Sequence, residues 1–280
     1  MKKSTTQNRQ EKLEAITAQL EQGVKEVFTS EKWTAYLHTM SRFHNYSFQN
    51  CILIAMQCPE ASLVAGYKKW QTLNRQVMKG QKAINILAPI FRKFEEEITK
   101  ADGTKEMKER QQIISFRTVP VFDLSQTDGE PLPSVCAPLT DSVKGFNDLL
   151  GRLEKLAPVA VSFEEINGGA NGYFSPMEEK IVVKHDLPEL QKVKTLIHET
   201  AHAMLHCTDG EEEKTDRDTK EVEAEAVAYT VLQYLGLDSS EYSFGYIAGW
   251  AGEKDVPQLK KSLDVIRRTA NTIIEGLEAA

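Results

Sequence analysis

The chain has 280 residues, of which 41% are apolar, so it can bury substantial hydrophobic cores and is long enough for two domains. Its formal net charge of −7 argues against nucleic-acid binding when charge is taken over the whole sequence. The four cysteines show neither CxxC spacing nor the density of a disulfide-rich domain, and no apolar run is long enough for a signal core or a membrane span. The composition therefore excludes a membrane protein and predicts a cytoplasmic protein with reduced thiols.

The first part of the chain is predicted to combine helices and strands. Hydrophobic spacing indicates two helices within 10–57, a helix near 67–75, and strands at 83–90 and 113–124. The charged stretch between the two strands contains an Asp-Gly pair at 102–103, which indicates a hairpin tip. Residues 126–140 hold another Asp-Gly pair and three prolines, and are therefore predicted to be a linker.

The charge of this first part differs from that of the whole chain. Residues 32–93 contain nine Lys or Arg and one acidic residue, Glu60, so their net charge is +8 and the rest of the chain carries −15. Aromatic residues alternate with these cations, at Trp33, Tyr36, Phe43, Tyr46, Phe48, Tyr67, Trp70 and Phe91. Cations can follow a phosphate backbone while exposed rings stack on bases. The segment therefore favours binding of single-stranded nucleic acid without sequence preference.

Not all of these aromatic residues are expected to reach a ligand. Those at helix-like positions are better explained as core residues, whereas Tyr67 and Trp70 lie beside Lys68 and Lys69. Further along, three cations can supply phosphate contacts around Gly80, where glycine permits close backbone approach. The predicted DNA-binding residues are Tyr67, Lys68, Lys69, Trp70, Arg75, Lys79 and Lys82.

The second part of the chain is predicted to be mainly helical with one hairpin. The pattern indicates a hairpin over 171–184 and helices at 141–156, 188–207, 219–235 and 256–277. An exposed strand of the hairpin could hold an extended peptide, although an ordinary structural hairpin fits the same pattern. The predicted organisation is therefore a domain at 1–125, a linker at 126–140 and a domain at 141–280.

The helix at 188–207 contains the sequence His198-Glu199-Thr200-Ala201-His202, which is an HExxH motif. Its two histidines are four residues apart and share one helical face, where both can bind one Zn²⁺ at about 2.0–2.1 Å. Glu199 lies beside them and can take a proton from a water molecule. The motif predicts His198 and His202 as metal ligands and Glu199 as the catalytic residue of a metallopeptidase.

A third metal ligand is expected from the next helix, 219–235. Glu221 and Glu225 share a face of that helix, and Glu225 is flanked by small apolar residues, so its carboxylate needs a partner. Glu225 is predicted as the ligand, with Glu221 as the alternative. His206 lacks the spacing of a third histidine ligand and is expected to be structural. Oxyanion donors are expected among the tyrosines, where the candidates are Tyr173, Tyr229 and Tyr246.

Both halves resemble known families. From about residue 145 the chain resembles the zincin domain of the ImmA/IrrE kind, in which HExxH is followed by a Glu-Ala-x-x-aromatic ligand motif that Glu225-Ala226-Val227-Ala228-Tyr229 fits. Residues 45–50 and 64–82 resemble the single-stranded-DNA-binding domain of ArdC-type antirestriction proteins. The resemblance implies an α+β fold of two domains, encoded by a conjugative plasmid or related mobile element.

The sequence thus predicts a single-stranded-DNA-binding protein with a zinc metallopeptidase domain. Zn²⁺, or another divalent metal, would be bound by His198, His202 and Glu225, leaving one position for water, and the protein would protect incoming DNA from restriction. The expected partners are single-stranded DNA and a protein or peptide substrate, and no membrane. The alternative is a protective single-stranded-DNA-binding protein without catalysis, whose metal domain is structural or regulatory.

Overall fold

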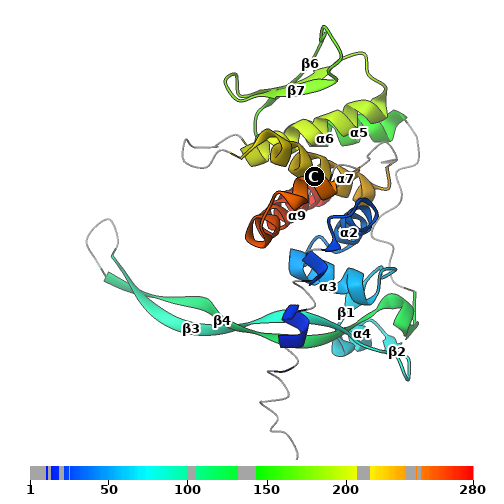
Figure 1. Ribbon diagram of the computed structural model, residues 1–280, viewed down its shortest axis with the longest axis vertical. Coiled ribbons are helices and arrows are strands. Elements are labelled where there is room, and N and C mark those ends of the chain that lie inside the picture. Colours follow the sequence, from blue (N-terminus) through cyan, green and yellow to red (C-terminus); the bar gives the residue numbers. More distant parts are fainter. Residues whose placement is uncertain are drawn as a thin grey trace, which may run out of the picture.

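The computed structural model describes residues 11, 14–18, 22–24, 26–99, 105–131, 143–206, 215–237, 244 and 247–279. A helical body carries a small sheet at one end and a long two-stranded ribbon at the other (Figure 1). The α+β class predicted from the sequence is confirmed. The helices are α2 (Ser30–Arg42), α3 (Phe48–Gln57), α4 (Tyr67–Thr72), α5 (Val143–Leu156), α6 (Glu189–His206), α7 (Arg217–Leu235), α8 (Ile247–Gly252) and α9 (Val256–Ala279). The strands are β1 (Val64–Ala65), β2 (Arg75–Val77), β3 (Ile84–Thr99), β4 (Lys105–Asp123), β5 (Thr127–Gly129), β6 (Ala160–Glu164), β7 (Gly172–Ser175) and β8 (Lys180–Lys184).

The ribbon is the hairpin of β3 and β4. The two strands pair antiparallel from Ile84↔Val121 to Thr99↔Lys105, with one bulge after Ile90. The hairpin is the predicted one, but the strands continue through the charged stretch, and the predicted tip at 102–103 lies outside the described residues. Only the base of the ribbon packs on the helices, where Asn50 of α3 exchanges hydrogen bonds with the backbone of Leu87.

A second small sheet closes the base of the ribbon. Strand β2 pairs antiparallel with β5, whose residues fall inside the predicted linker 126–140. Gly129 is required there, because its φ of +140° is disfavoured for other residues and an added Cβ would come within 2.3 Å of the carbonyl oxygen of Asn74. The chain is thus still part of the N-terminal fold at residue 129. The remainder of the predicted linker, from 132 onward, lies outside the described residues.

The sheet at the other end has the order β6-β8-β7, with β6 parallel and β7 antiparallel to β8. Strands β7 and β8 form the predicted hairpin, whereas β6 has too weak a pattern to be predicted. The buried residues Ile181, Val182 and Val183 make β8 the central strand, and α6 packs against β7 and β8. This packing places one edge of the sheet beside the HExxH motif.

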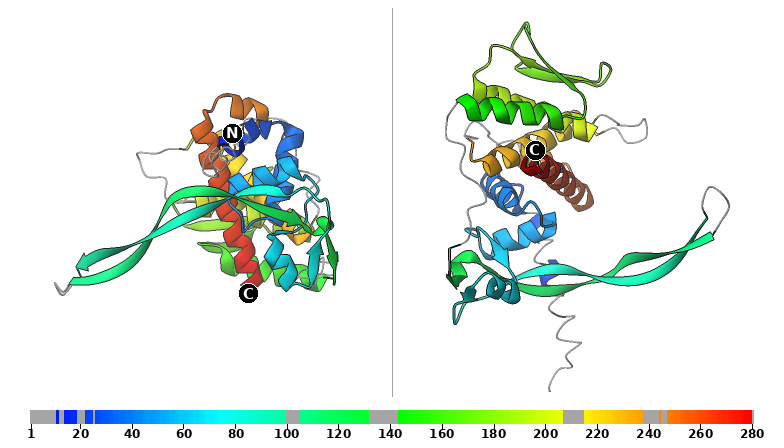
Figure 2. Two further views of the ribbon diagram at one scale, coloured as in Figure 1. Left: turned by 90° about the horizontal axis from the view of Figure 1, so that it is seen from below. Right: turned by 180° about the vertical axis from the view of Figure 1, so that it is seen from behind.

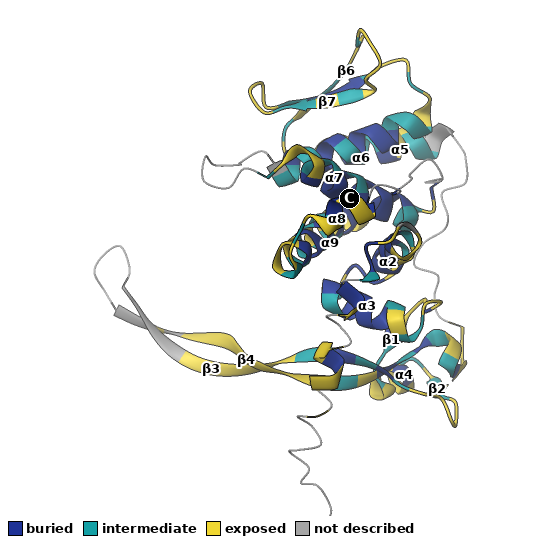
Figure 3. Cartoon of the chain, viewed as in Figure 1, coloured by how far each residue is buried: buried dark blue, intermediate teal, exposed yellow. Residues whose placement is uncertain are grey.

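The body has a core to which both halves of the sequence contribute. Helix α2 packs against α7 and α8, and α3 against α9 (Figure 2). The ring of Trp33 stacks on Phe28 at 5.0 Å between centroids and meets Phe244 edge-on at 6.3 Å. The buried apolar residues of α2, α3, α6, α7 and α9 form one cluster. Burial is concentrated in these helices, and the ribbon is largely exposed (Figure 3). Among the described residues, no helix combines the length and the apolar character needed to cross a membrane.

Asp216 is the N-cap of α7, and we expect its removal to destabilise the protein. Its carboxylate accepts hydrogen bonds from the backbone N–H and the hydroxyl of Thr219 and pairs with Lys254 at 2.7 Å, which together hold the pKa of Asp216 at about 2. Asp216→Ala should lower the free energy of unfolding at pH 7 by about 1 kcal/mol, measured by urea denaturation. Asp216→Asn retains a side-chain oxygen that can cap the helix, so its free energy of unfolding should fall by less.

The pH dependence of this effect follows from the lowered pKa. The stabilisation by the carboxylate is complete above the unfolded value of about 3.9 and is lost as the pH falls toward 2. The difference in free energy of unfolding between the wild-type protein and Asp216→Asn should therefore be constant from pH 7 to 5 and shrink between pH 4 and 2. A difference that grows on acidification would contradict this assignment.

Candidate metal centre and nucleic-acid surface

Helix α6 presents both histidines of the HExxH motif to one pocket. Its apolar face, including the fully buried Leu196, Ile197 and Ala201, packs into the core and leaves the imidazoles on the opposite side. The Nε2 atoms of His198 and His202 are 3.1 Å apart, and the rings meet edge-on at 4.7 Å between centroids. Two nitrogen atoms therefore converge on one point, as their spacing in the sequence predicts.

Helix α7 brings a third donor to the same point. The Oε2 atom of Glu221 is 3.6 Å from Nε2 of both His198 and His202. In the part of the chain that the structure describes, these three residues form the group whose possible ligand atoms all lie within 4.8 Å of one another. Two donors that bind one Zn²⁺ tetrahedrally are about 3.3 Å apart. The observed separations of 3.1 and 3.6 Å therefore fit a shared metal ion.

The side-chain positions favour Glu221 over Glu225, the ligand predicted first. Both carboxylates are on one face of α7, but Glu225 does not belong to the group of converging donors among the described residues. One helical turn of 5.4 Å separates them, so the point at which α7 crosses α6 decides which carboxylate faces the two imidazoles. The sequence shows that Glu221 and Glu225 share a face of α7, but it does not show where α7 crosses α6. It therefore could not decide which of the two carboxylates faces the imidazoles.

Glu199 lies in the pocket beside the histidines and is 8% exposed. Burial raises the pKa of its carboxyl group, although His198, His202 and the backbone N–H of Phe174 act in the opposite direction. A carboxylate whose pKa is raised accepts a proton more readily at neutral pH. Its position and its pKa therefore suit the role of a general base.

Gly172 allows β7 to approach α6 closely enough for this arrangement. A Cβ at residue 172 would lie 2.6 Å from Cγ2 of Thr195 and 2.9 Å from the carbonyl oxygen of Val182. It would also lie 3.5 Å from Cγ of Glu199. A larger residue would push β7 away from the helix and with it the Phe174 N–H that bonds to Glu199.

The ionisable groups of the cluster are strongly coupled. Burial acts to lower the pKa of His198, but the close Glu221 carboxylate and the charges of Glu199 and Glu225 outweigh burial and raise it. The neighbouring His198 and His202 imidazoles, each 3.6 Å away, hold the pKa of Glu221 far below its usual range. Glu221 is therefore a carboxylate at neutral pH, as a metal ligand must be.

A pocket of about 610 Å³ opens over the three donors. Strand β7 forms one wall and the start of α7 the other. Of the predicted oxyanion donors, Tyr173 lines this pocket and is 43% exposed, Tyr229 is buried against Phe244, and Tyr246 lies outside the described residues. Arg217 and Lys220 also line the pocket and were missed. Arg217 and Lys220 lie four residues and one residue before Glu221 in the sequence. This proximity was the feature from which their position at the pocket could have been predicted.

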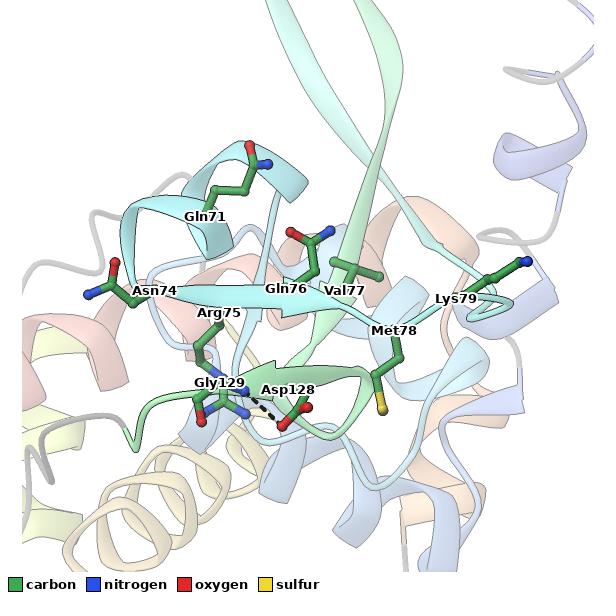
Figure 4. A pocket seen from close by; sticks show the side chains of 9 residues that line it. All are labelled: Gln71, Asn74, Arg75, Gln76, Val77, Met78, Lys79, Asp128 and Gly129. Carbon is green, nitrogen blue, oxygen red and sulfur yellow. Dashed lines mark hydrogen bonds between the residues drawn. The ribbon is translucent and has the colours of Figure 1, made fainter.

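Of the predicted DNA-binding residues, Arg75 and Lys79 line a second pocket, of about 820 Å³, beside β2 and β5 (Figure 4). Lys79 points away from β5 in this view, and Tyr67, Lys68, Lys69 and Lys82 are exposed. Arg75 is instead turned toward β5, where its guanidinium donates to the hydroxyl and carbonyl oxygens of Thr127 at 2.9 and 3.0 Å. The predicted phosphate contact from Arg75 is therefore corrected, because this side chain holds β5 to β2.

Trp70 also requires a correction. The residue is 0% exposed, and its indole N–H donates to the carbonyl oxygen of Phe122 at 2.9 Å. The prediction that Trp70 stacks on bases is wrong, because its ring fills the core between α4 and β4. Tyr67, three residues earlier on α4, is 44% exposed, and its hydroxyl accepts a hydrogen bond from the side chain of Gln76.

Two family models match the chain, one in each half. The N-terminal domain of anti-restriction factor ArdC matches residues 6–122. The IrrE N-terminal-like domain, a model of the peptidase M78 group, matches residues 157–247. The chain therefore consists of an ArdC N-terminal domain followed by a metallopeptidase-like domain of the IrrE type, and both resemblances seen in the sequence are confirmed. It is an ArdC-like protein with a candidate His-His-Glu metal site.

Individual proteins are also similar to this chain. The metal-free crystal structure of antirestriction protein ArdC from plasmid R388 has a TM-score of 0.50 and 19% identity, covering 81% of this chain and 84% of that one. The Mn(II)-bound structure of the same protein has a TM-score of 0.47 and 18% identity, covering 81% and 83%. The uncharacterized Bacillus anthracis protein pXO2-81 is 27% identical over an alignment of 276 positions that covers 85% of this chain. The chain spans 46% of the length of that relative.

We expect metal binding to distinguish the two carboxylates of α7. Glu221→Gln should weaken binding of Zn²⁺ by more than the roughly 10- to 100-fold that follows loss of a ligand's hydrogen-bond partner. Glu225→Gln changes the charge identically one turn further on and should weaken binding by roughly tenfold or less. Calorimetric titration of the metal-stripped protein with Zn²⁺, and in parallel with Mn²⁺, measures both. If Glu225→Gln weakened metal binding more than Glu221→Gln does, Glu225 would be the ligand.

Proposed function

We propose that this chain binds single-stranded DNA through its N-terminal half and hydrolyses peptide bonds at a metal centre in its C-terminal half. The metal would be held by His198, His202 and Glu221, with Zn²⁺ as the first candidate. The observation that carries the proposal is the convergence of these three donors beside the buried Glu199, at the floor of an open pocket. A structural metal site would need neither a neighbouring base nor an open side.

The residues around the donors suit the hydrolysis of a peptide. When bound, the metal would supply Lewis acidity to water and to the scissile carbonyl group. Glu199 would take a proton from the attacking water and later pass it to the leaving amine. Tyr173 and the cations Arg217 and Lys220 line the same pocket and can face the negative charge that develops on the carbonyl oxygen.

Strand β7 offers a way to hold the substrate. It is the last strand of the order β6-β8-β7, so one of its edges has no strand partner in its sheet. Gly172, Tyr173 and Phe174 of that strand line the pocket. An extended peptide that pairs with this edge would lie along the pocket beside Glu199. Backbone pairing of this kind selects extended or unfolded segments over folded protein.

The N-terminal half supports the DNA-binding part of the proposal. Residues 32–93 carry a net charge of +8, and the ArdC N-terminal domain covers all of them. On α4 the exposed Tyr67, Lys68 and Lys69 combine a ring with two cations. The exposed Lys79 and Lys82 follow between β2 and β3, where the chain enters the ribbon. By its ArdC-like organisation, the protein is proposed to protect incoming DNA of a mobile element from restriction.

Cleavage should depend on Glu199. In the protein reconstituted with Zn²⁺, Glu199→Gln should lower the rate of cleavage of a quenched fluorescent peptide library by roughly 10²- to 10⁴-fold while metal binding persists. Glu189→Gln, on the exposed first turn of α6, makes the same charge change outside the pocket and should cleave normally. Retained cleavage in Glu199→Gln would refute the mechanism. An inactive wild-type protein that binds metal would favour the alternative of a structural metal domain.

DNA binding should show the salt dependence of phosphate contacts. For a labelled single strand, the slope of log K against log salt should fall by about 0.7 for each of Lys79→Gln and Lys82→Gln. Trp70→Phe should leave the affinity unchanged but lower the free energy of unfolding by about 1 kcal/mol, because it removes the hydrogen bond to Phe122. Fluorescence anisotropy over a salt series measures the slopes. Absent or salt-independent binding by the wild-type protein would reject this half of the proposal.

A further inference from the structure

The β3–β4 ribbon exposes an unusual amount of apolar surface. Among the described residues, seven of the thirteen exposed large hydrophobic side chains lie on this hairpin. They include all three exposed phenylalanines, Phe91, Phe94 and Phe116. The ribbon leaves the body over much of its length (Figure 2), and the described parts of the chain leave these three rings exposed. Exposed apolar surface of this kind is a hazard for aggregation, which indicates that it serves binding.

The apolar residues gather in the part of the ribbon nearer the body, here called the ribbon stem and defined as residues 87–94 of β3 and 110–119 of β4. Its cross-strand pairs Pro89↔Phe116 and Phe91↔Ile113 follow one another on one face, because residues two apart in a strand point the same way. Phe91 is 54% exposed, Ile113 49% and Phe116 42%. Phe94, opposite Arg110, adds a ring on the other face.

The charge of the ribbon changes sign along its length. The ribbon stem contains Arg92, Lys93, Arg110 and Arg117 and no acidic residue, so its net charge is +4. The outer part, residues 95–99 and 105–109, contains five Glu and two Lys, a net charge of −3. Within the described residues, neither Arg92 nor Arg117 has an ion-pair partner, whereas Lys93 pairs with Glu109 at 2.7 Å. The ribbon stem therefore combines an excess of cations with exposed rings, whereas the outer part has a net negative charge and no aromatic residue.

This combination selects the chemistry of the occupant. Rings that lie on a sheet surface beside guanidinium groups can stack on unpaired bases while the cations contact phosphates. A DNA duplex would offer its phosphates but no base faces for the rings. A second copy of this chain that paired ribbon stem against ribbon stem would bring four further cations against the first four, and like charges at an interface are unfavourable. The observations therefore favour a single-stranded nucleic acid.

The ribbon stem also continues the surface already assigned to DNA. Strand β1, which pairs with the end of β4, leads directly into α4 with its exposed Tyr67 and Lys68. Eight residues of strand span about 26 Å, so the ribbon stem lengthens that surface by several nucleotides. The acidic outer part would repel a phosphate backbone and so set a limit to the site.

We propose that the ribbon stem binds a single strand of DNA that passes around its edge and contacts both faces. Phe91 and Phe116 stack on bases on one face, and Arg92 and Arg117, which alternate with these rings and lie on the other face with Phe94, contact phosphates. This inference rests on the proposed DNA-binding function and assigns it a second site, which the sequence motifs of residues 67–82 do not include. It also gives a role to a hairpin that contributes little to the hydrophobic core.

The test uses the full-length chain and a fluorescently labelled oligothymidine. The double variant Phe91→Ser/Phe116→Ser should weaken binding by tenfold or more, and Arg92→Gln/Arg117→Gln should reduce the salt slope by about 1.4. Met107→Ser, an exposed apolar change on the outer ribbon, and Lys155→Gln, an exposed charge change on α5, are matched controls that should bind as the wild type does. In Phe91→Trp, the indole fluorescence should be quenched by the oligonucleotide, which tests the position without removing the ring.

The outcomes separate this inference from the proposed function. If the wild type binds and Lys79→Gln weakens binding while both ribbon-stem variants bind normally, the ribbon stem is not the site, although DNA binding stands. If the wild type binds no single strand, both proposals fail. Equal losses for a duplex of the same length would contradict base stacking. If Phe91→Ser/Phe116→Ser changes the oligomeric state measured by sedimentation but leaves the DNA affinity unchanged, the rings join copies of the chain and the proposal is wrong.

Discussion

Helix α7 is the element on which the arrangement of this protein depends, because it is covered on nearly all sides. Helix α6 packs against one side of it, and α2, α8 and α9 cover the others. Small residues such as Ala224, Ala226 and Ala228 are fully buried and allow these helices to approach closely. A helix that is buried all round cannot slide without opening the core. The position of Glu221 opposite the HExxH histidines is therefore set by the packing of the whole body.

The same packing joins the two halves of the sequence. The rings of Phe28 and Trp33, from the first half, meet Phe244 and Trp250 from the second. A further contact between the two halves is the hydrogen bond between the side chains of His44 and Asn271 of α9, at 2.7 Å. The helices that precede the proposed DNA-binding segment thus form part of the support of the candidate metal centre, because the two halves of the chain share one core.

Helix α6 and strand β7, which line the candidate metal pocket, nonetheless lie toward the opposite end of the body from the β3–β4 ribbon (Figure 1). A strand of DNA on the ribbon and a peptide along β7 would occupy different surfaces, so the two proposed activities need not compete. Any effect of one on the other would have to pass through α2, α3 and the buried α7.

The sequence by itself determined the elements and the local chemistry. The spacing of His198 and His202 defines one helical face because an α-helix repeats every 3.6 residues, and the long apolar periods of α6, α7 and α9 predict those helices closely. Gly236 ends α7 in the left-handed conformation that glycine accepts readily, at a φ of +69°. These features depend on neighbours in the chain, so they can be read from it.

Only the tertiary structure decided between residues that are locally equivalent. Glu221 and Glu225 share a face of one helix, and the crossing of α7 over α6 selects the first. Tyr67 and Trp70 both lie beside lysines, but contact with β4 buries the second. Arg75 is an ordinary cation in the sequence, yet its partner lies 52 residues away in β5. Such choices depend on contacts between distant segments, and no local pattern of residues encodes where those segments meet.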